Sequence, residues 1–130
     1  MRLGYVIIYV ASVADTMDFY SRAFGLEKGR TDPTGEYGEM KTGGTVLAFV
    51  AEEFAHSNLR DGFRQNRSEE KPPGVEIALV TGDVDQAWSR AVREGALPYG
   101  KPEAKPWGQR VGYVRDPGGI LIEICSEPAG

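Results

Sequence analysis

The sequence predicts an α+β fold in which one strand–helix–strand unit is written twice along the 130 residues. Two stretches share the pattern, GYVIIYVASVADTMDFYSRAFG at residues 4–25 and GVEIALVTGDVDQAWSRAVREG at residues 74–95. Each begins with a glycine and a short apolar run, crosses a polar turn, and continues as an amphipathic segment that ends at a glycine. Because neither helix could cover a whole sheet alone, we expect two curved sheets around one shared cleft, with a helix on each outer face.

Both expected helices carry a start signal. Ser12 with Asp15, and Asp83 with Gln86, have the spacing of a capping box, in which a side-chain oxygen accepts from a backbone N–H of the first turn. Trp88 lies in the middle of the second helix at the spacing of a buried stripe, so we expect it to pack in the core.

Strand signals follow each helix. In the first half a β-forming run follows Gly43 and Gly44, and in the second half an Asp-Pro-Gly-Gly turn at residues 116–119 precedes an apolar strand. The polar stretch RQNRSEEKPPG between the halves ends in a double proline, which is typical of a linker. We therefore predict a single domain, 1–130, composed of a module at 1–63, a linker at 64–73 and a module at 74–130.

Composition narrows the classes of function. The 19 acidic and 15 basic residues give a net charge of -4, which offers no basic face for a nucleic acid. No apolar run reaches the length of a membrane span, and the first ten residues have the pattern of a strand, not of a signal peptide, so we expect a cytoplasmic protein. With His56 as the one histidine and Cys125 as the one cysteine, the chain has no internal disulfide and no His-rich or Cys-rich metal centre.

Strand alternation predicts which side chains share a face. Tyr5 and Tyr9 share the mixed face of the first strand, and Glu76 and Glu123 lie on the mixed faces of the strands at residues 75–80 and 120–125. A single glutamate on such a strand usually faces solvent. Two matched glutamates could also hold a divalent ion, share a proton or receive a cationic ligand, and the pattern leaves these alternatives open.

The segments DTMDFYSRAFGLE and YVRDPGGILIEI, together with the repeat, resemble the vicinal oxygen chelate superfamily. That superfamily includes glyoxalases, extradiol dioxygenases, fosfomycin-resistance enzymes and bleomycin-resistance proteins. The resemblance covers almost the whole chain. It implies two βαβββ modules that form a curved mixed sheet around a cleft, and a homodimer.

The resemblance also implies four metal-ligand positions, which fall on Tyr5, Ala48, Glu76 and Glu123. Neither Tyr5 nor Ala48 is a strong ligand, and two carboxylates alone attract a hard cation only weakly. We therefore expect no metal cofactor, with Glu76 and Glu123 as the ligands if a divalent ion does bind.

Among metal-free members, the closest resemblance in pattern is to bleomycin-resistance proteins. Pro106 to Gly108 resembles the corner at which those proteins place a tryptophan at the cleft, so Trp107 would stack on a ligand and the glutamates would attract its charge. Trp107 could instead pack on the sheet edge. Gln109 lies on the strand beside Glu123, and His56 lies in a segment that covers the cleft in many members. An exposed loop position is the plainer interpretation of His56.

The leading hypothesis is thus a protein that sequesters an aromatic or cationic small molecule in a metal-free cleft. The ligand-binding candidates are Tyr5, Tyr9, Ala48, His56, Glu76, Trp107, Gln109 and Glu123. A second hypothesis is a lyase, isomerase or dioxygenase-like enzyme, with Glu76 or Glu123 as catalytic acid or base or as weak metal ligands. A third is an accessory module with a vestigial cleft.

Overall fold

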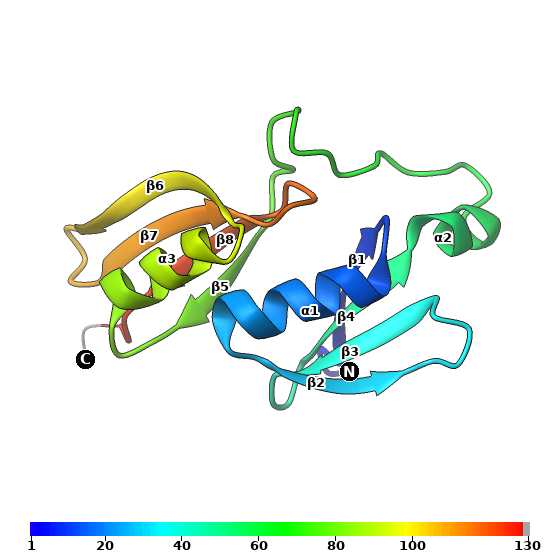
Figure 1. Cartoon of the computed structure of the whole chain (residues 1–130), viewed down its shortest axis with the longest axis horizontal. Coiled ribbons are helices and arrows are strands. Elements are labelled where there is room, and N and C mark those ends of the chain that lie inside the picture. The colour runs from blue at the N-terminus through cyan, green and yellow to red at the C-terminus, as the bar shows by residue number, and fades with distance from the viewer. Residues whose placement is uncertain (129–130) are drawn as a thin grey trace. The chain divides into compact units, whose positions relative to one another are not determined.

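The computed structural model describes residues 1–128 and divides the chain into two compact units, Met1–Gln65 and Asn66 onward. The boundary between the units falls inside the expected linker. Each unit contains one four-stranded mixed sheet with a helix on one side (Figure 1). The α+β class and the repetition of the module are therefore confirmed.

In the first unit the sheet has the strand order β1-β4-β3-β2. Strand β1 runs parallel to β4, and the other neighbouring pairs are antiparallel. The long helix α1 contacts β2, β3 and β4. The elements are β1 (Tyr5–Val10), α1 (Val13–Phe24), β2 (Glu27–Thr31), β3 (Tyr37–Lys41), β4 (Val46–Ala51) and α2 (Glu52–Asn58).

The second unit repeats this topology with the order β5-β8-β7-β6. Strand β5 runs parallel to β8, the other pairs are antiparallel, and α3 contacts β6, β7 and β8. The elements are β5 (Glu76–Val80), α3 (Val84–Arg93), β6 (Leu97–Ala104), β7 (Arg110–Arg115) and β8 (Leu121–Cys125). Both units therefore have the predicted order of one strand, a helix and further strands, with three strands after each helix.

The predicted helix starts are confirmed. Ser12 Oγ accepts a hydrogen bond from the backbone N–H of Asp15 at 3.2 Å, and Asp83 Oδ1 accepts from that of Gln86 at 3.1 Å. Each bond satisfies a backbone donor that the helix itself leaves without a partner. The first helix also ends as predicted, at Gly25, whose φ of 69° lies in the left-handed region.

Helix α2 was not predicted, because its seven residues follow β4 without a side-chain cap. Two local features favour it. Glu52 and Glu53 lie in the first turn, where the helix dipole favours negative charge. Ala55 is buried and gives the short helix an apolar contact, because short helices depend on packing more than on propensity.

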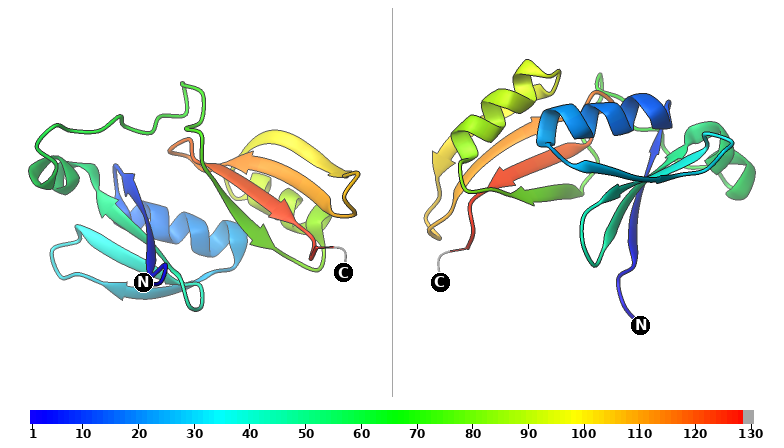
Figure 2. Two further views of the ribbon diagram at one scale, coloured as in Figure 1. Left: turned by 180° about the vertical axis from the view of Figure 1, so that it is seen from behind. Right: turned by 60° about the horizontal axis from the view of Figure 1, so that its bottom comes forward.

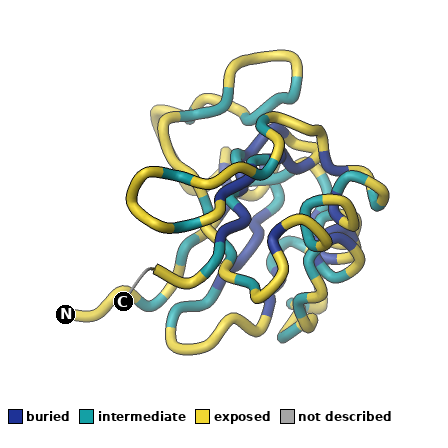
Figure 3. The backbone as a smooth tube through the Cα atoms, turned by 90° about the vertical axis from the view of Figure 1, so that its left-hand side faces the viewer, coloured by how far each residue is buried: buried dark blue, intermediate teal, exposed yellow. Residues whose placement is uncertain are grey.

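The helix-facing sides of the two sheets form the two cores. Figure 2 shows a helix lying along one side of each sheet, and Figure 3 shows the buried positions along the backbone. In the first unit Tyr20 of α1 packs on Phe49 of β4, with 4.9 Å between ring centres. In the second, Trp88 packs over β7 and its Nε1–H donates to the carbonyl of Tyr113 at 2.9 Å, which confirms its structural role. Within residues 1–128 no helix is long and apolar enough to cross a membrane.

We call the opposite side of each sheet its open face. In the first unit the open face carries Tyr5, Ile7 and Tyr9 of β1 with their cross-strand neighbours. In the second it carries Glu76, Ala78 and Val80 of β5 with their cross-strand neighbours. The predicted binding residues on strands all occupy these two faces, as alternation requires.

The linker is tied to the second unit by one buried arginine. Arg115 is 8% exposed and donates to three carbonyl oxygens, those of Gly119 at 2.9 Å, Ser68 at 3.1 Å and Arg67 at 3.3 Å. Gly119 has a φ of 101°, and a side chain there would collide with Arg115 and with the Arg67 carbonyl. Arg67 and Ser68 of the linker are therefore part of the second unit's packing.

Candidate functional site

Glu76 and Glu123 lie on the same open face of the second unit. Ala78 pairs with Glu123 across the parallel strands, and Glu76 pairs with Leu121, two residues earlier on β8. The two glutamates are therefore diagonal neighbours on adjacent strands, a spacing that long side chains bridge. Glu76 is exposed as a residue and Glu123 is half-buried.

Glu123 is the acceptor at the centre of this face. The hydroxyl of Tyr113 donates to Glu123 Oε1 at 3.2 Å, and Glu76 and Cys125 lie beside Glu123 on the same face. Partial burial raises the pKa of Glu76, and the neighbouring Glu123 raises it further. The folded chain therefore holds the Glu76 proton more tightly than an exposed glutamate would.

The neighbours of Glu123 are neutral hydrogen-bond donors. Burial, reinforced by Glu123, raises the pKa of the Cys125 thiol to about 11. Burial is also the main reason that the pKa of Tyr113 is raised, followed by the charges of Glu123 and Glu76. At neutral pH both groups keep their protons, and Cys125 is not a reactive thiolate.

The cross-strand register settles how the strand beside Glu123 is oriented. Tyr113 pairs directly with Glu123, so its side chain lies on the open face. The other neighbour of Tyr113, Gly100 on β6, has no side chain, and a Cβ there would lie 3.3 Å from the Tyr113 ring. Gly100 thus leaves room for that ring. The sequence alone could not show which side chains of this strand lie on the open face, because it does not reveal the pairing register of β7 with β8.

Trp107 lies at the tip of the β6–β7 hairpin and is 59% exposed. Its Nε1–H donates to Gln109 Oε1 at 2.8 Å, and Gln109 Nε2 in turn donates to the Ser126 carbonyl at 2.9 Å. Gly108 turns the chain there with a φ of 96°. The indole is therefore held in one orientation by Gln109 and the end of β8, while its ring remains open to solvent.

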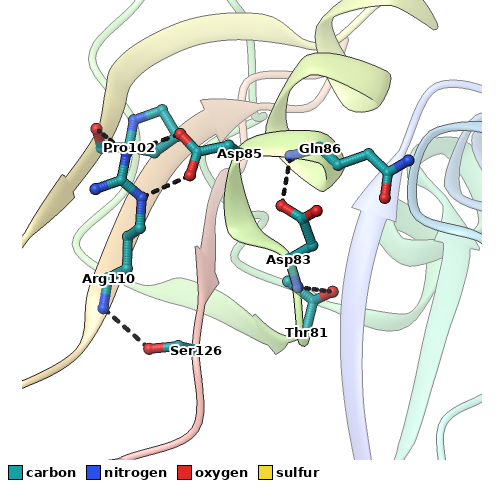
Figure 4. Close-up of polar contacts among 7 residues, drawn as sticks. All are labelled: Thr81, Asp83, Asp85, Gln86, Pro102, Arg110 and Ser126. Carbon is teal, nitrogen blue, oxygen red and sulfur yellow. Dashed lines mark hydrogen bonds and ion pairs between the residues drawn. The ribbon is translucent and has the colours of Figure 1, made fainter.

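The strand end beside this turn is fastened to α3, as Figure 4 shows. The guanidinium of Arg110 makes two bonds to the carboxylate of Asp85, from Nε at 2.6 Å and from Nη2 at 2.8 Å. Nη2 also reaches the Pro102 carbonyl at 3.4 Å, and the Arg110 backbone N–H donates to Ser126 Oγ at 2.9 Å. These bonds restrain the hairpin at the end that carries Trp107.

The remaining predicted positions belong to the first unit. Tyr5 is 53% exposed on β1, whereas Ala48 on β4 is fully buried beneath its neighbours. Tyr9 is half-buried and meets Phe63 edge-on, with 4.8 Å between ring centres. The role of these three residues in binding stays a prediction.

His56 lies on α2, exposed to solvent. Its ring stacks on Phe63 with 4.3 Å between ring centres, and its Nε2 lies 3.4 Å from Gln65 Nε2. Phe63 therefore links His56 to Tyr9, at one end of the first unit's open face. The His56 ring packs on an aromatic side chain in this arrangement, and its role in ligand binding stays a prediction.

Sequence reasoning missed a polar cluster on the first unit. Tyr37 and Glu39 of β3 and Arg30 of β2 meet on its open face, where the Tyr37 hydroxyl donates to Glu39 Oε2 at 2.6 Å. The alternation in the strand YGEMK could have placed Tyr37 and Glu39 on one face. However, the sequence does not reveal that Glu39 pairs with Ala48, one of the positions expected to hold a metal ligand.

The donor set does not fit a tightly held transition metal. The family-implied positions supply a phenol at Tyr5, a methyl group at Ala48, and the two carboxylates of Glu76 and Glu123. Zinc and iron sites need imidazole or thiolate ligands that these positions lack. Within residues 1–128 no group of three or more His, Cys, Asp or Glu side chains is placed to hold a metal ion.

Known proteins of this fold resemble the whole chain. The model of the Glyoxalase/Bleomycin resistance protein/Dioxygenase superfamily matches residues 2–124. A glyoxalase-related enzyme from Fulvimarina pelagi is 21% identical with a TM-score of 0.83, and the match covers 100% of this chain and 93% of that one. A member of the superfamily from Sphaerobacter thermophilus is 24% identical with a TM-score of 0.70 and 98% of both chains covered. A family enzyme from Burkholderia phytofirmans is 19% identical with a TM-score of 0.78, over 97% of this chain and 98% of that one. No curated protein matches the sequence.

Proposed function

Because the chain belongs to the Glyoxalase/Bleomycin resistance protein/Dioxygenase superfamily, we propose that it is a small-molecule-binding protein of the bleomycin-resistance type. It sequesters an aromatic or cationic ligand on the open face of the second unit without a metal. Glu123 and Glu76 supply the negative charge, Tyr113 orients Glu123, and Trp107 supplies a stacking surface.

The observation that carries this proposal is the arrangement around Glu123. Its carboxylate is half-buried, accepts from Tyr113, and has Glu76 as its diagonal neighbour on the adjacent strand. Low solvent exposure strengthens its attraction for a ligand cation, because a less polar surrounding screens charge less than water does. Trp107 adds a ring whose orientation is fixed but whose face is free, which suits stacking on a flat ligand.

The test uses benzamidinium, a flat aromatic cation, titrated into the full chain and followed by NMR. We expect shifts in the backbone resonances of β5 and β8 and in the Trp107 indole N–H. Glu123→Gln should weaken binding about tenfold, the loss expected for one partly desolvated charge contact. Glu70→Gln in the linker makes the same charge change away from the site and should leave binding unchanged. Equal binding by the Glu123→Gln variant would contradict the proposal.

A second candidate function is supported by the raised pKa of Glu76. A glutamate whose pKa is raised holds its proton more tightly and can act as a general acid, with Glu123 as the paired base. This enzyme would be a lyase, isomerase or dioxygenase-like member. Turnover of a substrate that falls at least a hundredfold in Glu76→Gln but keeps its KM would favour it over sequestration.

We also propose a homodimer in the cytoplasm. In each unit one edge of the sheet is formed by a strand with exposed apolar side chains: Tyr5 and Ile7 on β1, and Val80 on β5. Unpaired strand edges with apolar neighbours favour association, because they expose both hydrogen-bonding groups and hydrophobic surface. Light scattering should give twice the mass of the 14.2 kDa chain.

A further inference from the structure

The open face of the first unit carries a polar cluster of its own. The guanidinium carbon of Arg30 lies 5.2 Å from the centre of the Tyr37 ring, and the Tyr37 hydroxyl donates to Glu39 Oε2. Stacking on an aromatic ring restrains the planar guanidinium, which reduces the entropy lost when it binds a ligand. The cluster thus presents two charged groups in a partly fixed geometry.

Both charged groups keep unused hydrogen-bonding capacity. Arg30 Nη2 lies 3.7 Å from Glu39 Oε2, which is too far for a hydrogen bond, and the guanidinium donates to no other group within residues 1–128. Tyr37 and Arg30 both approach Oε2, so Oε1 of Glu39 has no hydrogen-bond partner in that part of the chain. The side chains are 66% exposed for Arg30 and 18% exposed for Glu39.

The cluster carries no net charge. Burial, reinforced by Glu39, raises the pKa of Tyr37 to about 12, so the phenol remains a neutral donor to Oε2. Arg30 and Glu39 then cancel each other. A simple anion would be attracted by Arg30 and repelled by Glu39, and a simple cation would meet the reverse. The matching group has a hydrogen-bond acceptor beside a donor and no net charge.

An exposed aromatic ring shares this face with the cluster. Tyr5 is 53% exposed on β1 and pairs with Val46 of β4, two residues before the Ala48 that pairs with Glu39. An exposed ring on the same face as a donor and an acceptor is a combination that binds flat polar molecules.

We propose that Arg30 and Glu39 form a second binding site that takes the amide edge of an aromatic carboxamide or lactam. The ligand carbonyl accepts from the Arg30 guanidinium, its N–H donates to Glu39 Oε1, and its ring contacts Tyr5. All three residues of this site belong to the first unit.

The test is a titration of the full chain with three molecules of nearly the same shape: benzamide, benzoate and benzamidinium. We expect benzamide to bind with about millimolar affinity, as its size allows, and to shift the resonances of Arg30, Glu39 and Tyr5. Benzoate and benzamidinium should bind there at least about fivefold more weakly, the value of one lost hydrogen bond. Tighter binding of benzoate than of benzamide would show a simple anion site at Arg30. Tighter binding of benzamidinium would show a simple cation site at Glu39, and the absence of any shift with benzamide would show that there is no site. Each of these three results overturns the proposal.

Substitutions then test the two contacts separately. Arg30→Lys keeps the charge but loses the planar group, and Glu39→Gln keeps the shape but replaces the carboxylate; each should weaken benzamide binding about fivefold or more. As a control, Glu27→Gln breaks the exposed ion pair between Glu27 of β2 and Lys41 of β3, and it should leave binding unchanged. Retained NMR dispersion will show that each variant is folded. Benzamide binding that survives both Arg30→Lys and Glu39→Gln would overturn the assignment, while benzamidinium binding at Glu123 reports independently on the second unit.

Discussion

The two units place their polar side chains at different positions of the same sheet. The registers make Tyr5 equivalent to Glu76, Ala48 to Glu123, and Glu39 to Tyr113, because Ala48 pairs with Glu39 as Glu123 pairs with Tyr113. The first unit therefore has its carboxylate on the third strand of the module, and the second has its carboxylates on the first and fourth. The same topology supports a net-neutral polar cluster in one unit and an acidic pair in the other.

The largest difference in stability is expected between substitutions of Arg115 and of Lys41, which lie at equivalent ends of β7 and β3. Arg115 is buried and donates to three carbonyl groups, whereas Lys41 is exposed and forms an ion pair with the exposed Glu27. Arg115→Met removes one donor from each of those carbonyls and should lower the free energy of unfolding by about 3 kcal/mol. Lys41→Met should change it by less than about 0.5 kcal/mol. Urea unfolding of both variants measures this difference, and similar losses would show that the linker contacts add little.

A smaller effect is expected at the two glycines beneath the helices. Gly112 lies under Trp88, and a Cβ there would approach the indole at 2.9 Å and the Pro102 backbone at 3.3 Å. Gly38 is its equivalent, and a Cβ there would collide with the flexible side chain of Met17 and approach Val13 Cγ1 at 2.9 Å. We expect Gly112→Ala to cost about 2–3 kcal/mol and Gly38→Ala about 1–2 kcal/mol, because Met17 can change rotamer whereas the indole is hydrogen-bonded and the Pro102 backbone cannot move aside. Thermal unfolding gives the order, and a greater loss for Gly38→Ala would contradict it.

These pairs also show what the sequence could and could not predict. Strand alternation needs no tertiary information, so it placed Glu76 and Glu123 on one type of face correctly. The pairing of Tyr113 with Glu123 depends on the geometry of the β7–β8 turn, which composition does not determine. The anchoring of the linker by Arg115 joins residues 47 positions apart in sequence, so no local pattern contains it.

The hydroxyls of the two open-face tyrosines offer a finer comparison. Tyr37 donates to Glu39 at 2.6 Å, and Tyr113 donates to Glu123 at 3.2 Å. Tyr37→Phe should lower the free energy of unfolding by about 1 kcal/mol, because it removes the shorter hydrogen bond of a half-buried carboxylate. Tyr113→Phe should cost about half as much, because its hydrogen bond to Glu123 is longer. Chemical unfolding at pH 7 measures both, and the reverse order would contradict this ranking.

The smallest effect, and the one most specific to the second unit, is a dependence on pH. The pKa of Glu76 is raised above its ordinary 4.5 by partial burial and by Glu123, so the folded chain holds this proton more tightly than the unfolded chain does. The stabilisation is complete below pH 4.5 and is lost as the pH rises through the folded-state value. Glu76→Gln cannot ionise, so it should unfold at a higher temperature than the natural chain at pH 7 and at nearly the same temperature at pH 4. Tyr5→Phe, the equivalent change in the first unit, should produce no such difference between the two pH values. An equal gain from Glu76→Gln at both pH values would mean that packing, and not the charge beside Glu123, distinguishes the two faces.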